Sequence, residues 1–401
     1  IPNPQSPIPK LFILFISILF LIFKQFKYIN IYKIKMTTNP DYFIPQQIDD
    51  TVQCLKFIPN QNSNYLATGG WDNKLRVFNI NYNIINQGLP QEDAQITSQL
   101  ELGNQQNSPI FSLSWEGNTG RIFTGCADGS INYVDLQKNS STTLGRHKNP
   151  CKEVIYHQNY NILLSGGYDG SVKIFDLRSG NEVCTYQFDN KVYTMSCVKD
   201  LLVVGLSELK MAYFNLAKLQ NKMFKPEIIF NSHLKYQTRK VSVFPDGRGF
   251  AEGSIEGRVA IKNIRDLNNP PQINNDNGTT MGKDDQGKED FAFRCHRNTK
   301  TDPVLVYSVN DIAFNPVYGT FCTVGSDGVY SIWDKVKRSR LYERDNTDNI
   351  PITCCDYNSA GNLLAYASGY DWSRGAEAAK EYNVNNNKIG IHYLPPKQRK
   401  N

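Results

Sequence analysis

The sequence lacks an apolar stretch long enough to cross a membrane. Its longest apolar run, residues 11–23, has 13 residues, whereas a transmembrane helix needs about 20. A signal-peptide cleavage site is also missing, since residues 1–35 contain no Gly, Ala or Val. We therefore interpret residues 1–35 as a non-native tail translated from an untranslated region, with Met36 as the true start. The alternative is a signal anchor, and the lysines that follow the run would then keep the downstream domain cytosolic.

Strong charge of either sign is also lacking. The chain has 44 Lys and Arg against 38 Asp and Glu, a formal net charge of +6. Five of those lysines and none of the acids lie in residues 1–35, so residues 36–401 carry 39 basic and 38 acidic residues. A body this close to neutral excludes a protein that attracts nucleic acid mainly by its overall charge.

Catalytic and metal-binding motifs are the third absence. The sequence has no phosphate-binding glycine loop, no H-E-x-x-H and no G-x-S-x-G. Its nine cysteines form no C-x-x-C pair, and several lie in apolar runs, so we expect reduced core thiols. We therefore predict a protein that is not an enzyme and needs neither a metal nor a cofactor.

A repeated unit is what the sequence does have. Seven short apolar segments each end at an acidic residue, and six of these have the closing position of the unit six residues later. The seven acidic positions are Asp72, Asp128, Asp169, Glu208, Glu256, Asp327 and Asp371. Such regular recurrence indicates a repeat architecture.

Each unit has the pattern of a small antiparallel sheet. Asp-Gly at 128–129, 169–170 and 327–328, and Glu-Gly at 256–257, predict tight hairpin turns with positive φ at glycine. A further apolar strand precedes each unit. One such sheet cannot bury both of its faces, but radial repetition can. We therefore predict an all-β fold, a seven-bladed WD-repeat β-propeller over residues 36–401, with residues 38–48 as a candidate strand to complete blade seven.

Two polar segments, 80–107 and 265–290, are predicted to be insertions between the strands of this propeller. His147 and His233 precede blade strands, and we expect each to form hydrogen bonds within its blade. Neither has a carboxylate or thiol partner at the spacing of a catalytic motif.

Several stretches resemble one particular propeller family, the Rae/Gle mRNA export factors of the nuclear pore. The resemblance covers about residues 39–394, and it is strongest in the segments 234–239, 253–260, 291–297, 307–316, 323–335 and 365–375. A sister family, the mitotic checkpoint propeller, shares some of them. The segment Tyr370–Gly375, YDWSRG, is similar to the export factor and not to its checkpoint relative.

The resemblance implies a binding function. Members of both families hold a short hairpin with acidic residues on one face of the propeller, and the partner of the export factor is a GLFG-repeat nucleoporin. Arg239 matches the hairpin-contacting arginine of the family, and Arg258 is a second candidate. An arginine suits this task because its planar group can pair with both oxygens of a carboxylate.

The resemblance also implies contact with single-stranded RNA as part of the complex. Residues that could form a local basic surface are Lys235, Lys240, Arg294, Arg297 and Lys300. We expect a monomer within a heteromeric assembly, in the nucleus and at the nuclear pore, that shuttles to the cytoplasm. The alternatives are a spindle-checkpoint adaptor that binds checkpoint-kinase hairpins and, on the weak motif Asp176–Arg178, a substrate receptor of a ubiquitin ligase.

Overall fold

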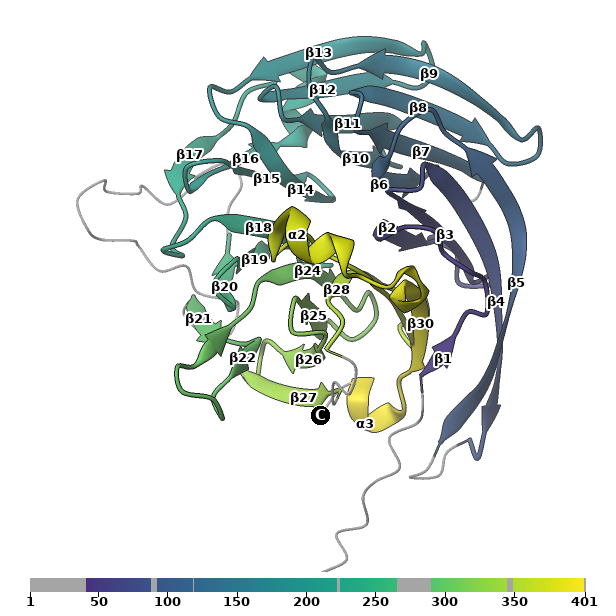
Figure 1. Ribbon diagram of the computed structural model, residues 1–401. Helices are drawn as coiled ribbons and strands as arrows, with labels where there is room; N and C mark the ends of the chain where they lie inside the picture. Colours follow the sequence, from purple (N-terminus) through teal and green to yellow (C-terminus); the bar gives the residue numbers. More distant parts are fainter. Residues whose placement is uncertain are drawn as a thin grey trace, which may run out of the picture. The chain divides into compact units, whose positions relative to one another are not determined.

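Seven antiparallel sheets of four strands each make up the body of the protein (Figure 1). The computed structural model describes residues 41–87, 92–117, 119–221, 224–264, 290–344 and 349–399. The predictions for residues 1–35 and for nearly all of 265–290 lie outside this part. The predicted all-β seven-bladed propeller is confirmed.

The first four blades follow the chain in simple order. Their strands are β2 (Val52–Phe57), β3 (Tyr65–Gly70), β4 (Lys74–Ile85), β5 (Asp93–Gln105), β6 (Ile110–Trp115), β7 (Arg121–Cys126), β8 (Ser130–Asp135), β9 (Ser140–Arg146), β10 (Cys151–His157), β11 (Ile162–Gly167), β12 (Ser171–Asp176), β13 (Asn181–Gln187), β14 (Val192–Val198), β15 (Leu201–Leu206), β16 (Lys210–Asn215) and β17 (Ile228–Asn231). A 3₁₀ helix, η1 (Leu216–Asn221), lies between the last two.

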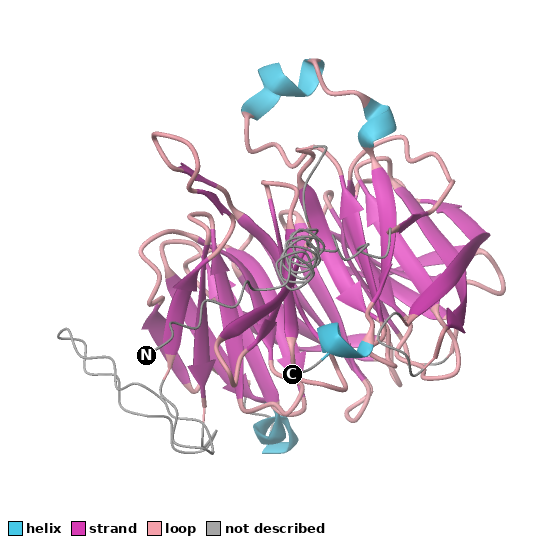
Figure 2. Ribbon diagram, turned by 90° about the horizontal axis from the view of Figure 1, so that it is seen from below, coloured by secondary structure: helices cyan, strands magenta, loops and turns pink. Residues whose placement is uncertain are grey.

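Blades five to seven carry the helices and a small extra ribbon. Their elements are β18 (Thr238–Val243), β19 (Gly249–Ser254), β20 (Arg258–Asn263), β21 (Phe291–Arg294), β22 (Arg297–Asn298), β23 (Leu305–Val306), β24 (Val309–Phe314), β25 (Phe321–Gly325), β26 (Tyr330–Asp334), β27 (Ser339–Glu343), β28 (Ile352–Tyr357), β29 (Leu363–Ser368), α2 (Gly375–Lys380), η2 (Val384–Asn386), β30 (Lys388–Tyr393) and α3 (Pro396–Arg399). The connection from β29 to β30 holds α2 and rises beyond the strand ends (Figure 2).

The ring is closed by a strand from the start of the described body. β1 (Tyr42–Phe43) pairs with β30 and completes blade seven, which confirms the candidate segment 38–48. Asp41, just before β1, accepts hydrogen bonds from His392 Nδ1 at 2.8 Å and Tyr366 Oη at 2.6 Å, and it pairs with Arg344 Nε at 3.0 Å. These contacts fix the first strand to blades six and seven.

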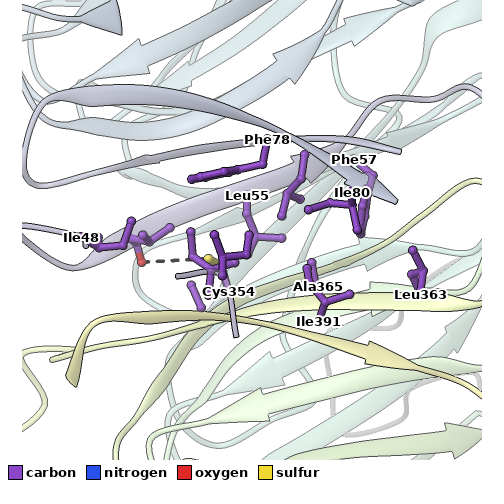
Figure 3. Packing of buried hydrophobic residues seen from close by; sticks show 14 of the residues in the cluster. Ile48, Leu55, Phe57, Phe78, Ile80, Cys354, Leu363, Ala365 and Ile391 are labelled. Carbon is purple, nitrogen blue, oxygen red and sulfur yellow. Dashed lines mark hydrogen bonds between the residues drawn. The ribbon is translucent and has the colours of Figure 1, made fainter. Parts of the chain in front are cut away.

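The apolar core is divided among the contacts between blades. In the described part of the chain, seven clusters of buried side chains each join two neighbouring blades. Figure 3 shows the cluster between blades one and seven, where Leu55 and Phe78 face Ala365 and Ile391. The hydrophobic free energy therefore stabilises the ring as a whole and not a single blade.

The predicted hairpin turns are confirmed. Gly129, Gly170, Gly257 and Gly328 have φ values of 86°, 79°, 63° and 72°. A Cβ atom at Gly129 would lie 2.5 Å from the carbonyl oxygen of His147. Glycine is required there both by the turn and by this close approach.

The polar segment 80–107 is mostly strand. β4 and β5 pair from Lys74 with Gln105 to Ile85 with Asp93, and they form the outer half of blade one. Buried Ile80 and the tilted contact of Tyr82 with Tyr393, 6.3 Å between ring centroids, attach this hairpin to the ring. The many asparagines and glutamines of this segment made it resemble an insertion in the sequence, although it continues the strands of blade one.

Within the described residues, no helix is long and apolar enough to span a membrane.

Candidate functional site

A ring of β-bulges surrounds one mouth of the central channel. In every blade the inner strand contains one extra residue without a partner in the neighbouring strand. The seven bulged residues, in blade order, are Gln53, Phe111, Lys152, Tyr193, Arg239, Asn310 and Thr353. All of them line one cavity of about 470 Å³. Because a bulge redirects a side chain out of the regular pleat, the repeat itself produces a circle of side chains at the channel mouth.

The next residues along the inner strands close the channel below this ring. Lys240 Nζ lies 3.2 Å from Glu153 Oε1 and 3.5 Å from Asp311 Oδ1. Burial lowers the pKa of Lys240, but Asp311 and Glu153 outweigh it, and the net shift is upward. The one ammonium thus bridges two carboxylates, and all three charged groups of this layer have an ion-pair partner.

The bulge ring, in contrast, holds two cations that are not paired. Arg239 and Lys152 are its charged members, and neither side chain has a hydrogen-bond or ion-pair partner within the described part of the chain. Burial lowers the pKa of Arg239, against the opposing influence of Asp371 and Tyr168. A desolvated cation without a partner is costly, and it is suited to receive a negative group from outside.

A second cavity of about 900 Å³ adjoins the first and shares Arg239 and Ile255 with it. Its far side is formed by the insertion of blade seven, including Arg374 and Tyr382. Exposed apolar side chains border it, with exposed fractions of 46% for Ile255 and 42% for Val306. Arg239 therefore lies at the junction of the two cavities, on a partly apolar face of the propeller.

The segment Tyr370–Gly375 is rigidly attached to this face. Asp371 is buried and accepts hydrogen bonds from Ser326 Oγ and from Asn310 Nδ2, the latter at 3.2 Å. The segment holds Trp372, whose φ is 62° and whose side chain is 50% exposed. Trp372 contacts Trp71 at 6.2 Å between ring centroids, and Trp71 contacts Phe111 at 5.2 Å. An aromatic series thus crosses from blade seven to blade two.

The predicted site residues are separated by the structure. Arg239 lies at the channel mouth, as described. Arg258 Nε lies 2.5 Å from Glu256 Oε1 in its own hairpin turn. Arg297 donates from Nη2 to the carbonyl oxygen of Glu256 at 2.7 Å.

The remaining residues predicted to contact RNA differ in their exposure and in their partners. Lys240 is held inside the channel by its two carboxylates, so it does not belong to an external basic surface. Lys235, Arg294 and Lys300 are exposed, and their side chains have no partner in the described residues. RNA contact by these three stays a prediction.

Of the two histidines predicted to form hydrogen bonds within a blade, His147 does so and His233 does not. His147 lies 3.1 Å from Asp169 Oδ1 through Nδ1 and 2.9 Å from Ser165 Oγ through Nε2, which confirms its role in blade three. The prediction for His233 is wrong, because both of its ring nitrogens lack a hydrogen-bond partner. In blade five, Glu252 pairs with Val241 as Ser165 pairs with Val154.

Glu252 is the physical reason for the difference in blade five. Glu252 lies where blade three has Ser165, its Oε1 accepts hydrogen bonds from Ser232 Oγ and Thr238 Oγ1, and neither of its oxygens is bonded to His233. In blade six, His296 has the role that His147 has in blade three, with Asp327 Oδ1 at 2.9 Å and Thr323 Oγ1 at 3.0 Å.

Sequence reasoning missed Lys152, Trp71 and Trp372 as site residues. Lys152 precedes Val154 by two residues, as Arg239 precedes Val241. Alignment of the seven inner strands would have placed the two cations at the same position. Trp71 directly follows β3, in the turn that carries it to the channel mouth.

Comparison with known proteins agrees with this architecture. The WD domain, G-beta repeat family matches residues 43–79 and 138–176. The poly(A)+ RNA export protein of Schizosaccharomyces pombe is 33% identical over 365 residues, which cover 88% of this chain and 91% of that protein. The chain belongs to the Rae1/Gle2 family of mRNA export factors.

Animal members of the Rae1/Gle2 family are equally similar. The mRNA export factor rae-1 of Caenorhabditis elegans is 33% identical over 369 residues, with 89% of each chain covered. The mRNA export factor of Xenopus tropicalis is 35% identical over 339 residues, which cover 82% of this chain and 83% of that protein. The predicted resemblance to this family is confirmed.

Proposed function

We propose that this protein is a non-enzymatic adaptor in mRNA export that binds an acidic hairpin of a GLFG-repeat nucleoporin at the channel mouth. The observation that carries the proposal is the state of Arg239. Its side chain is half-buried, lacks a partner among the described residues and lies between two cavities. A carboxylate would supply the missing partner in a charge-assisted, bidentate hydrogen bond.

The surroundings of Arg239 fit a folded peptide segment better than a small metabolite. Ile255 and Val306 present apolar surface at the cavities, and Trp372 packs on Trp71, which lines the first of them. Protein-binding sites typically combine a central arginine or aromatic anchor with such an apolar border. A hairpin with one acidic side chain and neighbouring apolar side chains matches this arrangement.

The names of the relatives support a role in mRNA export. A hairpin site is also compatible with a checkpoint kinase as partner, and a propeller can serve as the receptor of a ubiquitin ligase. Partner capture with the full chain, followed by mass spectrometry, separates these functions. A GLFG-repeat nucleoporin as the main partner supports the proposal. A checkpoint kinase or a cullin adaptor in its place would contradict it.

Contact with single-stranded RNA is the second part of the proposal. The exposed Lys235, Arg294 and Lys300 provide only a few free cations, and residues 36–401 are nearly neutral. Local phosphate contacts of this number give weak binding, so tight RNA binding should require the nucleoporin. The test is binding of a single-stranded RNA to the full chain with and without the hairpin. Tight binding by the chain alone would overturn this part.

Residence at the nuclear pore follows from the same proposal. A fluorescent fusion of the full chain should mark the nuclear rim and also exchange with the cytoplasm. The variant Arg239→Glu should lose the rim signal and keep a diffuse one, because the nucleoporin is the proposed anchor. Retention of the rim signal by the variant would show that Arg239 is not needed for residence at the pore.

A further inference from the structure

Lys152 in blade three has the same place in the repeat as Arg239 in blade five. The register of β10 with β11 skips Lys152 between Cys151 and Glu153, and the register of β18 with β19 skips Arg239 between Thr238 and Lys240. Both side chains line the same cavity. The other five members of the bulge ring are uncharged, and the two cations are two blades apart, with Tyr193 of blade four between them.

Glu153, the acidic residue next to Lys152, already has other partners. Glu153 accepts a hydrogen bond from Ser112 Oγ at 3.0 Å and pairs with Lys240. Lys152 itself has no side-chain partner in the described part of the chain. Burial lowers the pKa of Lys152, Glu153 opposes this, and the cations Lys240 and Arg239 add to it. The fold therefore keeps a second half-buried cation at the mouth without an ion-pair partner.

The space between the two cations is aromatic. Tyr193, the bulged residue of blade four, packs edge-on against Tyr168 with 5.8 Å between ring centroids. Both rings line the cavity. An apolar side chain fits over such a surface, and the exposed Lys191 also lines the cavity.

We infer that Lys152 is the second cation of the hairpin site, and that it binds a different carboxylate of the hairpin from the one that Arg239 binds. This inference rests on the proposed function and specifies the partner further. The hairpin should carry two acidic side chains on one face, with an apolar side chain between them that covers Tyr193 and Tyr168. Arg258, which is paired with Glu256, is then not needed as the second cation.

The experiment is calorimetric binding of a synthetic acidic hairpin peptide from a GLFG-repeat nucleoporin to the full chain and its variants. Lys152→Met keeps the length of the side chain and removes its charge. It should weaken binding by about 10- to 100-fold, the usual effect of losing one charge-assisted hydrogen bond. Lys152→Arg should recover most of the affinity. Lys148→Met is the matched control, because Lys148 is exposed, does not line the cavity and should not alter binding.

A double-mutant cycle identifies the carboxylate. Each glutamate of the peptide is changed to glutamine in turn, and each peptide is titrated against wild type, Lys152→Met and Arg239→Met. One substitution should lose its effect in Lys152→Met, and a different one in Arg239→Met. Effects that simply multiply for every glutamate would overturn the inference, since Lys152 would then act on the site only indirectly.

The outcomes distinguish this inference from the proposed function. Loss of binding in Arg239→Met with unchanged binding in Lys152→Met overturns the inference alone. Unchanged binding in both variants overturns the proposed function as well. If Lys152→Met weakens binding of a single-stranded RNA and leaves the peptide unaffected, the cation serves RNA and the inference is wrong. Thermal unfolding of Lys152→Met should be unchanged or shifted upward, because the removed charge has no partner to lose.

Discussion

Lys240 Nζ lies 3.2 Å from Glu153 Oε1 and joins the inner strand of blade five to that of blade three across the channel. The same ammonium lies 3.5 Å from Asp311 Oδ1 in blade six. One lysine thus connects three blades directly beneath the bulge ring. This layer holds the strands that position Arg239 and Lys152.

Removal of Lys240 should therefore destabilise the whole ring. Lys240→Met leaves Glu153 and Asp311 close together without their cation, in side chains that are only 11% exposed. The free energy of unfolding should fall by about 3 kcal/mol, as expected when one partner of a largely buried ion pair is lost. Urea unfolding measures the change. The double variant Lys240→Met with Glu153→Gln should recover part of it, and equal losses in the two variants would contradict this explanation.

The stability that Asp41 gives to the closed ring should depend on pH. The pKa of Asp41 is lowered from 3.8, since hydrogen bonds from His392 and Tyr366 and the charges of His392 and Arg344 outweigh the effect of burial. The unfolded chain therefore binds a proton more readily than the folded one. This contribution to stability is complete above about pH 4 and is lost as the pH falls through the lower folded value.

Asp41→Asn tests this dependence. The variant should be less stable than wild type at pH 7, and the difference should shrink as the pH falls below 4. Unfolding by urea at a series of pH values measures both. A constant difference at all pH values would mean that the carboxylate charge is not what fastens β1.

The two histidines expected to be alike should respond differently to substitution. His147→Leu removes hydrogen bonds to Ser165 and Asp169 and should lower the free energy of unfolding by about 2 kcal/mol. His233→Leu removes a partly buried ring without hydrogen-bond partners and should be neutral or stabilising. Equal losses in both variants would contradict the structure of blade five.

The pH dependence of His233 gives a second measurement. Burial lowers its pKa from 6.5 to about 4, with Lys262 adding to the shift and Asp290 opposing it. The unfolded chain thus binds more protons between these values, so wild type loses stability as the pH falls from 6.5 to 4. His233→Leu should lose less over this interval. Parallel curves for the two proteins would show that the ring titrates normally in the folded state.

Trp372 should contribute to hairpin binding and not to folding. Its side chain is 50% exposed and extends the aromatic series formed with Trp71 and Phe111. Trp372→Ala should weaken binding of the hairpin peptide by about 2 kcal/mol, a typical loss for a tryptophan anchor. Val183→Ala is a control, because Val183 is also exposed, at 52%, but lies on the outer strand β13. Equal small effects of both would exclude Trp372 from the site.

The parts of the fold that depend on local sequence could be predicted. Asp169 and Gly170 specify a hairpin turn by themselves, and seven copies of the repeated unit specify a propeller. The bulge ring could not be found this way, because a bulge depends on the pairing of two strands. Arg239 was found through the family resemblance. Lys152, at the equivalent position, was missed because nothing in its local sequence marks it.

Local sequence led to a wrong prediction in two places. His233 precedes a strand as His147 does, but Glu252 replaces the serine that His147 contacts, and it bonds to Ser232 and Thr238 instead. The asparagines and glutamines of 80–107 indicated an insertion, whereas buried Ile80 and packed Tyr82 continue the strand pattern of blade one. In both cases a contact with another strand decided the structure.

The central claim is that Arg239 receives a carboxylate of the nucleoporin hairpin. The most direct measurement is the affinity of the full chain for the acidic hairpin peptide, by calorimetry, in wild type, Arg239→Glu and the control Arg294→Glu. Arg239→Glu should lose binding through like-charge repulsion, while its thermal unfolding stays close to that of wild type. Arg294→Glu, exposed and outside both cavities, should bind normally. Binding of the peptide by folded Arg239→Glu at wild-type affinity would contradict the claim.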